Sequence, residues 1–505
     1  MSYQKRFFWL ILILLLAFSL RFFKISTNPH DLYIDEVSIG LNAATIVADG
    51  RDEYGQYFPV YFKAFGEYKL PIYIYTVALL QKITGPTPFS VRAPSAFFGS
   101  LTVLFFYFLI KETGAKQKIA LIASFLLAVS SWHLHFSRAG FEATLGLFLL
   151  VTGLWLFFKF INSSFSAFLF SSLILFGLAL YTYFPYRLFL PFLIPLVIYY
   201  QRQRLKEVLS RKKKTVYLLI IFMIIIPFLS GLFFQSGLKR ARDVSLFNSV
   251  PTDYDDYFTE TLLAPLTFYL KNFSSYFSLD FLFFIGDGNG RHSLREAGQN
   301  SVFLLPLAVL GLVRSLKKRK LSDKLFLSLF IIPAAVSASL LPSPHALRSL
   351  PMVLPIIYFS AKSLSVINSK KRAIFLIICS FFIYTFIQYL HIYYVHYRKK
   401  TSPDWSGGYR QTVEFVAGNI KRYKKVYVTK EMGFGETFFR FYLPQSYLGR
   451  GRSLPPNIKF ISSPFNPKTE EPFLYIGPHW EKWDGRKIGQ IRNSGNDLIF
   501  NLWEN

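Results

Sequence analysis

Two adjacent carboxylates near the start of the chain are the residues whose type and spacing most clearly suggest chemistry. Asp35 and Glu36 follow the first apolar segment, residues 7–23, by about a dozen residues. Acidic residues are scarce, because the 505 residues include 29 Asp and Glu against 57 Lys and Arg. The unperturbed pKa of an Asp side chain is about 3.9, so near neutral pH it is ionised and can accept a proton as a general base. The pair therefore indicates a reaction site at the boundary between lipid and water.

Asp35 could also serve only as the N-cap of a helix, because the residues that follow the pair, VSIG, begin a helical pattern. An N-cap does not require a second acid beside it, so the presence of Glu36 favours catalysis by Asp35. Glu36 would then assist by orienting a substrate or by binding a cation.

A second group of polar residues could bind an anionic substrate, because positive charge stabilises the negative charge that develops on a leaving group such as phosphate. Arg187 and Arg348 could instead be snorkelling anchors at helix ends, and Arg138 could form a local ion pair with Glu142. Asp287, within the sequence GDGNG, could be a turn residue. The candidate binding residues are Glu67, Lys69, Arg138, Glu142, Arg187, Arg291, His345 and Arg348.

The elements that carry these residues are predicted to be helices that cross a membrane. Hydrophobic residues make up 52% of the chain, and the mean hydropathy is +0.32. Apolar runs of roughly 17–25 residues recur along the chain, and this length spans a bilayer core. We therefore predict a polytopic α-helical membrane protein with about eleven transmembrane helices. The predicted spans are 7–23, 91–110, 117–133, 143–161, 165–183, 186–200, 216–235, 301–316, 323–341, 349–368 and 373–397.

Basic clusters set the predicted orientation, because Lys and Arg concentrate in the cytoplasmic loops of membrane proteins. They explain the net charge of +28 without nucleic acid as a partner. Residues 71–83 are too short to span comfortably and are predicted to lie along the outer interface. The segments predicted inside are the N-terminus and the loops 111–118, 201–215, 317–322 and 369–372. The segments predicted outside are 24–90, 134–142, 236–300, 342–348 and the C-terminal tail.

The chain is predicted to form two domains. Residues 1–397 form the transmembrane domain, which includes a first outer loop, 24–90, with interfacial helices. Residues 398–505 form a small α/β domain outside the membrane, with a helix over 404–422 and four strands. The single cysteine, Cys379, allows no intrachain disulfide. The predicted strands are 424–430, 457–463, 472–480 and 496–505.

Sugar transfer from a polyprenyl phosphate is a reaction that suits a base, several cations and aromatic-rich helices at one membrane face. Such a donor has an apolar tail, a phosphate at the membrane surface and a sugar in water. Aromatic residues, which are 19% of the chain, can line a groove for the lipid. A carboxylate base activates the acceptor hydroxyl, and inversion at the anomeric carbon needs no covalent intermediate. The sequence contains no P-loop, G-x-G-x-x-G or Cys/His metal motif.

The chain resembles the GT-C superfamily of integral-membrane glycosyltransferases. It is most similar to the family 39 branch, which is related to protein O-mannosyltransferases and lipid A aminoarabinose transferases. The resemblance rests on the order of the segments YIDEVSIGLNA, AFGEYKLP, SVRAPSAFFGSLTVLFFYFL and SWHLHFSRAGFEA. It covers residues 1–400 and is strongest over residues 28–145.

The resemblance implies a GT-C fold in which Asp35 is the catalytic base and Glu36 assists it. Glu67 and Lys69 stand where related enzymes place an acid and a lysine before an interfacial helix, although Glu-Tyr-Lys-Leu-Pro is a looser spacing than those enzymes show. Some GT-C enzymes use a divalent metal ion, and Asp35, Glu36 and Glu67 could supply oxygen ligands for one. The resemblance implies no other cofactor.

The expected protein is therefore a multi-pass glycosyltransferase of the cytoplasmic membrane. Its active site and C-terminal domain would lie on the extracytoplasmic side, and its acceptor could be a glycan, a lipid or a protein. A lipid-linked sugar flippase or other transporter is the main alternative, but transporters carry ionisable residues within their spans and these apolar runs contain few. A polysaccharide-assembly protein that uses the tail as a binding module would leave the acids and arginines unexplained.

Overall fold

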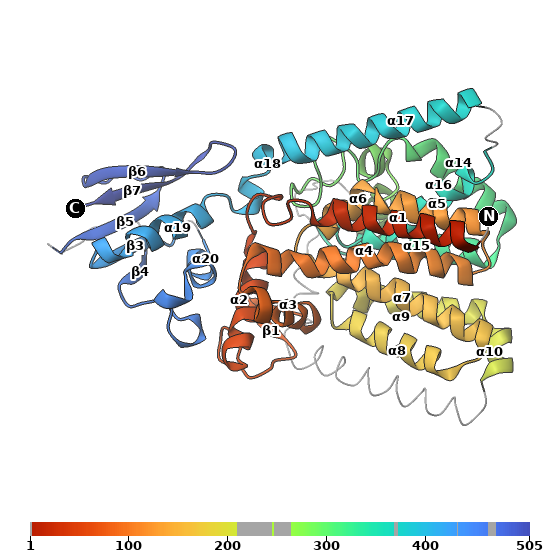
Figure 1. Cartoon of the computed structure of the whole chain (residues 1–505), viewed down its shortest axis with the longest axis horizontal. Coiled ribbons are helices and arrows are strands. Elements are labelled where there is room, and N and C mark those ends of the chain that lie inside the picture. Colours follow the sequence, from red (N-terminus) through yellow and green to blue (C-terminus); the bar gives the residue numbers. More distant parts are fainter. Residues whose placement is uncertain (1–2, 210–244, 247–263, 368–371, 432, 463–470) are drawn as a thin grey trace. The chain divides into compact units, whose positions relative to one another are not determined.

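The structure of the chain, a computed structural model, contains two compact units (Figure 1). Unit 1 comprises Met1–Phe23, Phe65–Ile72 and Ser95–Leu390. Unit 2 comprises Lys24–Ala64, Tyr73–Pro94 and His391–Asn505. The described residues are 3–209, 245–246, 264–367, 372–431, 433–462 and 471–505.

Unit 1 consists mainly of helices, and they form where the apolar runs of the sequence predict them. Each predicted span within the described residues contains a helix, and the predicted span 216–235 lies outside the described residues. The helix α4 (Pro88–Glu112) begins in unit 2 and continues through unit 1. The other elements of unit 1 are α1 (Tyr3–Phe22), β2 (Glu67–Lys69), α5 (Gln117–Ala128), α6 (Ser131–Ser137), α7 (Glu142–Ser163), α8 (Ser166–Leu180), α9 (Phe184–Tyr200), α10 (Arg202–Val208), α13 (Ala264–Ser275), η2 (Asp280–Phe284), α14 (Leu304–Lys318), α15 (Leu321–Ala338), η3 (Leu350–Met352), α16 (Val353–Leu364) and α17 (Arg372–His391).

Length and hydropathy identify a smaller set of helices that could cross a membrane. Among the described residues, α4, α7, α15 and the segment Leu376–Lys400 are long and apolar enough. The helices α5 and α6 together are also long and apolar enough, and the angle of 54° between them is that of a broken span or a re-entrant loop. These findings support a polytopic helical protein, whereas the number of eleven spans and their orientation remain predictions.

Glycines let the helices of unit 1 approach one another closely, as small residues do in membrane helix bundles. A Cβ atom at Gly153 of α7 would lie 2.7 Å from the ring of Phe176 in α8. A Cβ atom at Gly311 of α14 would lie 1.9 Å from the backbone oxygen of Phe359 in α16. A side chain at Gly311 would overlap the backbone of α16, so this helix pair requires glycine, whereas a side chain at Gly153 would force the ring of Phe176 to move.

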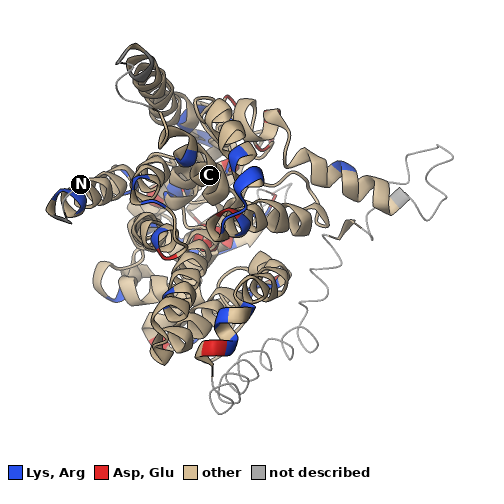
Figure 2. Cartoon of the chain, turned by 90° about the vertical axis from the view of Figure 1, so that its right-hand side faces the viewer, with Lys and Arg blue, Asp and Glu red and all other residues tan. Residues whose placement is uncertain are grey.

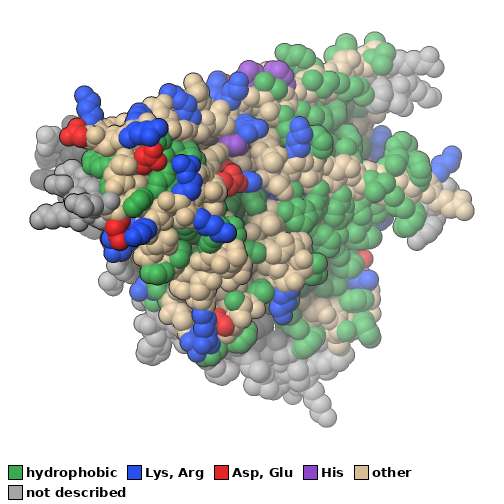
Figure 3. Space-filling view, turned by 60° about the vertical axis from the view of Figure 1, so that its left-hand side comes forward, with side chains coloured by type: hydrophobic (Ala, Val, Ile, Leu, Met, Phe, Trp, Pro, Cys, Tyr) green, Lys and Arg blue, Asp and Glu red, His purple; other side chains and the backbone are tan. Residues whose placement is uncertain are grey.

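On one face of unit 1, Figure 3 shows a broad area of hydrophobic side chains over its helices. Leu376 and Ile377 of α17, for example, are 62% and 68% exposed. Lys111 lies in the last turn of α4, and Lys317 and Lys318 lie in the last turn of α14. Figure 2 shows Lys and Arg at the ends of several helices. A bilayer would cover the apolar area and leave the basic helix ends in water.

Unit 2 combines the segment after α1 with the C-terminal part of the chain. Its main sheet has the strand order β4-β3-β5-β7-β6. The first three strands are parallel, and β7 pairs antiparallel with both β5 and β6. The elements are α2 (Ile34–Asp49), β1 (Phe62–Ala64), most of α3 (Pro71–Thr84), η4 (Ile392–His396), α18 (Tyr397–Lys400), η5 (Pro403–Trp405), α19 (Tyr409–Asn419), η6 (Ile420–Arg422), β3 (Lys425–Thr429), α20 (Gly435–Tyr442), η7 (Gln445–Tyr447), η8 (Arg450–Arg452), β4 (Ile458–Ile461), β5 (Phe473–Pro478), β6 (Arg486–Arg492) and β7 (Leu498–Glu504).

The C-terminal segment has the α/β character that its sequence predicts. All four predicted strands form, and α19 occupies the middle of the predicted helix 404–422. The strand β6 and the helix α20 were not predicted. The sequence of β6, RKIGQIR, lacks an apolar run because this edge strand is exposed along most of its length, and α20 has only eight residues.

The compact units divide the chain differently from the predicted domains 1–397 and 398–505. Most of the first outer loop, 24–90, belongs to unit 2 together with the C-terminal segment. The helix α2 packs closely against α20, since a Cβ atom at Gly40 would lie 2.5 Å from the ring of Phe441. This packing explains the difference, because α2 is buried along most of its length and needs a covering partner.

Candidate active site

The acidic pair lies at the N-terminus of α2 in unit 2. Tyr33 is the N-cap of this helix, and both acids belong to its first turn. Asp35 is therefore a helical residue and not the N-cap. Negative charge in the first turn is favourable, because the helix dipole is positive at that end. Consecutive helical residues do not face each other, so Asp35, which is half-buried, and Glu36, which is buried, meet different surroundings.

Glu36 forms a fully buried ion pair with Arg92, which lies near the start of α4. The Arg92 Nε donates to Glu36 Oε1 at 2.8 Å, and Nη2 donates to Oε2 at 2.9 Å. Both side chains have 0% exposure. Glu36 Oε2 also accepts a bond from the backbone N–H of Tyr33 at 3.3 Å. A carboxylate held on both oxygens by a guanidinium is better suited to anchoring the helix than to binding a metal ion or a substrate.

Arg92 also binds the segment that leads into α2. Its guanidinium donates to the backbone oxygens of Ile25, Pro29 and Asp31 at 3.2, 2.7 and 2.6 Å. It lies 5.5 Å from the ring centroid of Trp405 in η5. One buried arginine thus fixes the chain on both sides of the turn that presents Asp35.

Glu67, Lys69 and Arg187 lie in unit 1. Lys69 is buried at the last position of β2, and Glu67 is half-buried at its first position. The backbone N–H of Ile72 donates to the oxygen of Tyr181 at 3.3 Å, which ties the segment after Lys69 to the end of α8. Arg187 is buried at the same turn, where its Nε donates to the oxygen of Leu180 at 2.7 Å.

Arg138 is fully buried and binds the end of α1. Its guanidinium donates to the backbone oxygens of Leu20, Arg21 and Phe23. The last carbonyls of a helix have no partner within the helix, so Arg138 acts as a C-terminal cap for α1. Glu142, its predicted i, i+4 partner, is half-buried at the first position of α7.

The helix α6 carries the SWHLHFS sequence and holds three other segments of unit 1. The Nδ1 atom of His133 lies 2.7 Å from Nη2 of Arg21 in α1. The indole N–H of Trp132 donates to the oxygen of Ala346 at 3.2 Å, and His135 Nε2 contacts the oxygen of Arg291 at 2.8 Å. The short helix therefore connects the end of α1 with the two loops around residues 285–300 and 342–349.

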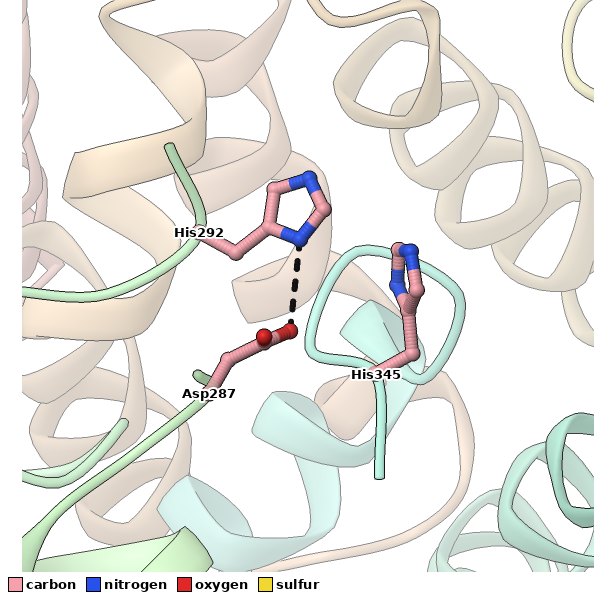
Figure 4. A group of neighbouring side chains, drawn as sticks. All are labelled: Asp287, His292 and His345. Atoms are coloured by element: carbon pink, nitrogen blue, oxygen red, sulfur yellow. Dashed lines mark hydrogen bonds and ion pairs between the residues drawn. The ribbon is translucent and has the colours of Figure 1, made fainter. Parts of the chain in front are cut away.

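These two loops bring together a carboxylate and two imidazoles, as Figure 4 shows. Asp287 Oδ2 lies 3.2 Å from His292 Nδ1, and the rings of His292 and His345 are 4.6 Å apart between centroids. Asp287 also accepts the backbone N–H groups of Ala346 at 2.7 Å and Asn289 at 2.8 Å. Asp287 thus does more than form a turn, because it binds both loops.

The electrostatics of the cluster follow from burial and hydrogen bonding. Burial would raise the pKa of the Asp287 carboxyl, but the hydrogen bonds from His292, Ala346 and Asn289 outweigh it and hold this pKa well below its usual range. Burial lowers the pKa of His292 and of His345. Near neutral pH the cluster therefore contains one carboxylate and two neutral imidazoles.

Arg291 and Arg348 come from the same two loops. The Nε atom of Arg291 lies 3.4 Å from the Oδ1 atom of Asn289. The guanidinium of Arg348 donates to the backbone oxygens of Leu341 and Pro342 at 2.9 and 3.2 Å. The structure therefore brings Arg291, His345 and Arg348 into one region of unit 1, whereas Asp35 and Glu36 belong to unit 2.

Sequence reasoning missed the partners that hold this site. Arg21 and Arg92 are not among the candidate residues of the sequence, yet both are fully buried. The only signal in the sequence is an arginine inside or at the edge of an apolar segment, where an unpaired charge is costly. Asp287 and His292 lie five residues apart in one loop, a spacing that does not by itself indicate a metal site, and His345 comes from another loop.

Comparison with known proteins identifies relatives of this architecture. The family model of dolichyl-phosphate-mannose-protein mannosyltransferases matches residues 69–230. ArnT from Cupriavidus metallidurans, solved bound to undecaprenyl phosphate, superposes with a TM-score of 0.58 at 10% identity over 98% of each chain. A search of curated proteins gives no match.

The archaeal oligosaccharyltransferase AglB from Archaeoglobus fulgidus is a second structural neighbour. It was solved in complex with an inhibitory peptide and a dolichol-phosphate. It superposes with a TM-score of 0.53 at 15% identity, covering 92% of this chain and 62% of its own. The chain thus spans less than two thirds of the length of this relative.

Proposed function

The chain has the GT-C glycosyltransferase fold, as its sequence predicted, and from this premise we propose that it is a membrane glycosyltransferase that uses a polyprenyl-phosphate-linked sugar donor. The family match and the likeness to ArnT over 98% of the chain support this proposal. The acceptor is a hydroxyl group of a glycan, a lipid or a protein. The reaction takes place at the extracytoplasmic face of the cytoplasmic membrane, where the sugar of the donor meets water.

Asp35 acts as the general base of this reaction. It takes the proton of the acceptor hydroxyl as the oxygen attacks the anomeric carbon. The bond from that carbon to the phosphate oxygen breaks on the opposite side, so the configuration inverts and the lipid phosphate leaves as an anion. Lys69, Arg187, Arg291 and Arg348 are candidates to stabilise the leaving phosphate.

The observation that supports this role for Asp35 is that the two acids have different surroundings. Glu36 is held on both oxygens by Arg92 and is fully buried, whereas Asp35 is half-buried in the first turn of the same helix. A base must reach its substrate, and its orientation must be fixed by groups that do not react. The pair of Glu36 and Arg92 supplies that support to α2.

The test is a transfer assay with a panel of polyprenyl-phosphate sugars and the full chain in detergent or vesicles. Asp35→Asn is expected to reduce transfer by about 10²–10⁴-fold, because it removes a general base, while thermal stability remains unchanged. Glu436→Gln is the matched control, since Glu436 is an exposed acid in the first turn of α20 in the same unit. A folded Asp35→Asn variant with full activity would exclude Asp35 as the base.

A further inference from the structure

The cluster of Asp287, His292 and His345 has the composition of a metal site that the proposed transfer reaction does not require. We propose that these three residues bind one divalent transition-metal ion of the zinc type, which joins the two loops of unit 1. Each residue offers one ligand atom, and these atoms lie within 4.8 Å of one another. Figure 4 shows Asp287 and His292 on one loop and His345 on the other.

The donor set is one that zinc accepts. Zinc prefers imidazole nitrogen, thiolate and carboxylate oxygen in tetrahedral sites, and sites with two histidines and one carboxylate are known. Bonds of about 2.0–2.1 Å place tetrahedral ligand atoms about 3.3 Å apart. Asp287 Oδ2 and His292 Nδ1 are already 3.2 Å apart. The ligand atom of His345, a half-buried residue, lies within 4.8 Å of the other two and would move closer to them when the ion binds.

Backbone hydrogen bonds hold the Asp287 carboxylate in the way that such bonds hold the ligands of metal sites. The backbone N–H groups of Asn289 and Ala346 donate to Asp287 Oδ1 and Oδ2 respectively. Hydrogen bonds of this kind orient the ligands of metal sites and fix their direction before the ion binds. The backbone N–H of His345 lies 3.1 Å from the hydroxyl of the buried Tyr276, which fixes the position of this loop residue.

The ion would fasten the two loops to each other on one side, while α6 holds both on another. His135 of α6 contacts the backbone of Arg291, and Trp132 of α6 contacts the backbone of Ala346. Arg291 directly precedes one histidine ligand, and Arg348 follows the other within the same loop. In the proposed function these arginines bind the donor phosphate, so the effect of the metal on sugar transfer rests on that function. Metal binding itself does not rest on it.

The experiment measures metal bound to the full chain, purified in detergent through a tag without histidine. The protein is stripped with EDTA, dialysed against Zn²⁺ and then against metal-free buffer, and its zinc content is determined by mass spectrometry. We expect about one zinc per chain, and His292→Gln and His345→Gln should each reduce this content at least tenfold. Replacement by Co²⁺ should give the visible absorption of a tetrahedral site.

The matched control is the double variant His391→Gln with His396→Gln. These two histidines lie 3.1 Å apart between their Nε2 atoms but are exposed and outside the cluster. The double variant should retain the zinc of the unmodified chain. Zinc content near zero in the unmodified chain, or zinc kept by both cluster variants and lost by the control, would overturn the proposal whether or not any variant folds poorly.

A sugar-transfer assay tests the proposed function independently of the metal site. Zinc binding without transfer of any sugar would leave the metal site intact and contradict the glycosyltransferase proposal. Sugar transfer by a chain that binds no zinc would support the glycosyltransferase proposal and contradict the metal site. If both hold, His345→Gln should raise the KM for the donor while removal of zinc from the unmodified chain produces the same change.

Discussion

At the scale of single residues, charges that look alike in the sequence have different tasks because of their burial. Glu36 and Asp35 are neighbours, yet only Glu36 faces Arg92. The charges of a buried ion pair have lost their contact with water. Removing one partner therefore leaves the other charge with neither a partner nor solvent, which is destabilising. A structural role for Glu36 and a catalytic role therefore predict different effects of a substitution on stability and on sugar transfer.

Glu36→Gln is expected to lower the free energy of unfolding by about 3–5 kcal/mol, because it leaves Arg92 buried without its counter-charge. The measurement is thermal or chemical unfolding of the chain in detergent. Glu414→Gln is the matched control, since Glu414 pairs with Arg410 in the same unit but is 57% exposed. Its loss should be within about 1 kcal/mol. Unchanged stability with abolished transfer in Glu36→Gln would instead favour a catalytic role.

The sequence could predict the acids and cations of the site by type, but not their partners. The scarcity of acids drew attention to Asp35 and Glu36, and the position of each basic residue relative to an apolar run was visible. The pairing of Glu36 with Arg92 depends on how α2 and α4 meet, which no local pattern encodes. The same holds for Asp287 with His345, which lie in separate loops.

At the scale of elements, the short helix α6 explains why the SWHLHFSRAG segment stood out. Arg138 in this segment and Glu142 just after it are the residues that the sequence predicts to bind substrate. The structure shows His133 contacting the Arg21 side chain of α1, and Trp132 and His135 contacting backbone oxygens of two loops. Arg138, which follows α6, binds three backbone oxygens at the end of α1. The element scaffolds the neighbouring loops.

Arg138→Gln should therefore destabilise the chain. Hydrogen bonds to charged groups contribute about 1.5–3 kcal/mol each, so we expect a loss of at least about 2 kcal/mol. Arg204→Gln in α10 serves as the control, because Arg204 is 52% exposed and pairs with Glu207 at the surface. If Arg138 were mainly a phosphate ligand, the KM for the donor would rise and thermal stability would stay the same.

Most helices could be located from the sequence because apolar runs have a distinctive length. The bend of 54° between α5 and α6 could not, since residues 117–133 read as one uninterrupted span. Ser130 begins α6 as its N-cap, accepting a bond from the N–H of His133, and this polar residue was the available signal. Strand β6 escaped notice because an exposed edge strand has no apolar run to reveal it.

At the scale of the whole molecule, the two units are not consecutive stretches of the chain. Unit 2 unites the segments 24–64 and 73–94 with the residues from 391 onward. Sequence reasoning treated the tail as a separate domain, because linear order and composition suggested a boundary near residue 397. Contacts between α2 and α20, and between Arg92 and Trp405, join these distant segments into one core.

A chain ending at residue 390 should accordingly lose the order of its first outer loop. Residues 36–46 of α2 are all buried, and removing α20 and η5 would expose their apolar surface to water. Limited proteolysis should then cleave within 24–64 in the shortened chain but spare this segment in the full chain. Supplying residues 391–505 as a second polypeptide should restore protection, because the missing surface returns. Equal protection in the shortened chain would show that the first outer loop folds without the C-terminal segment, as the predicted domain boundary implied.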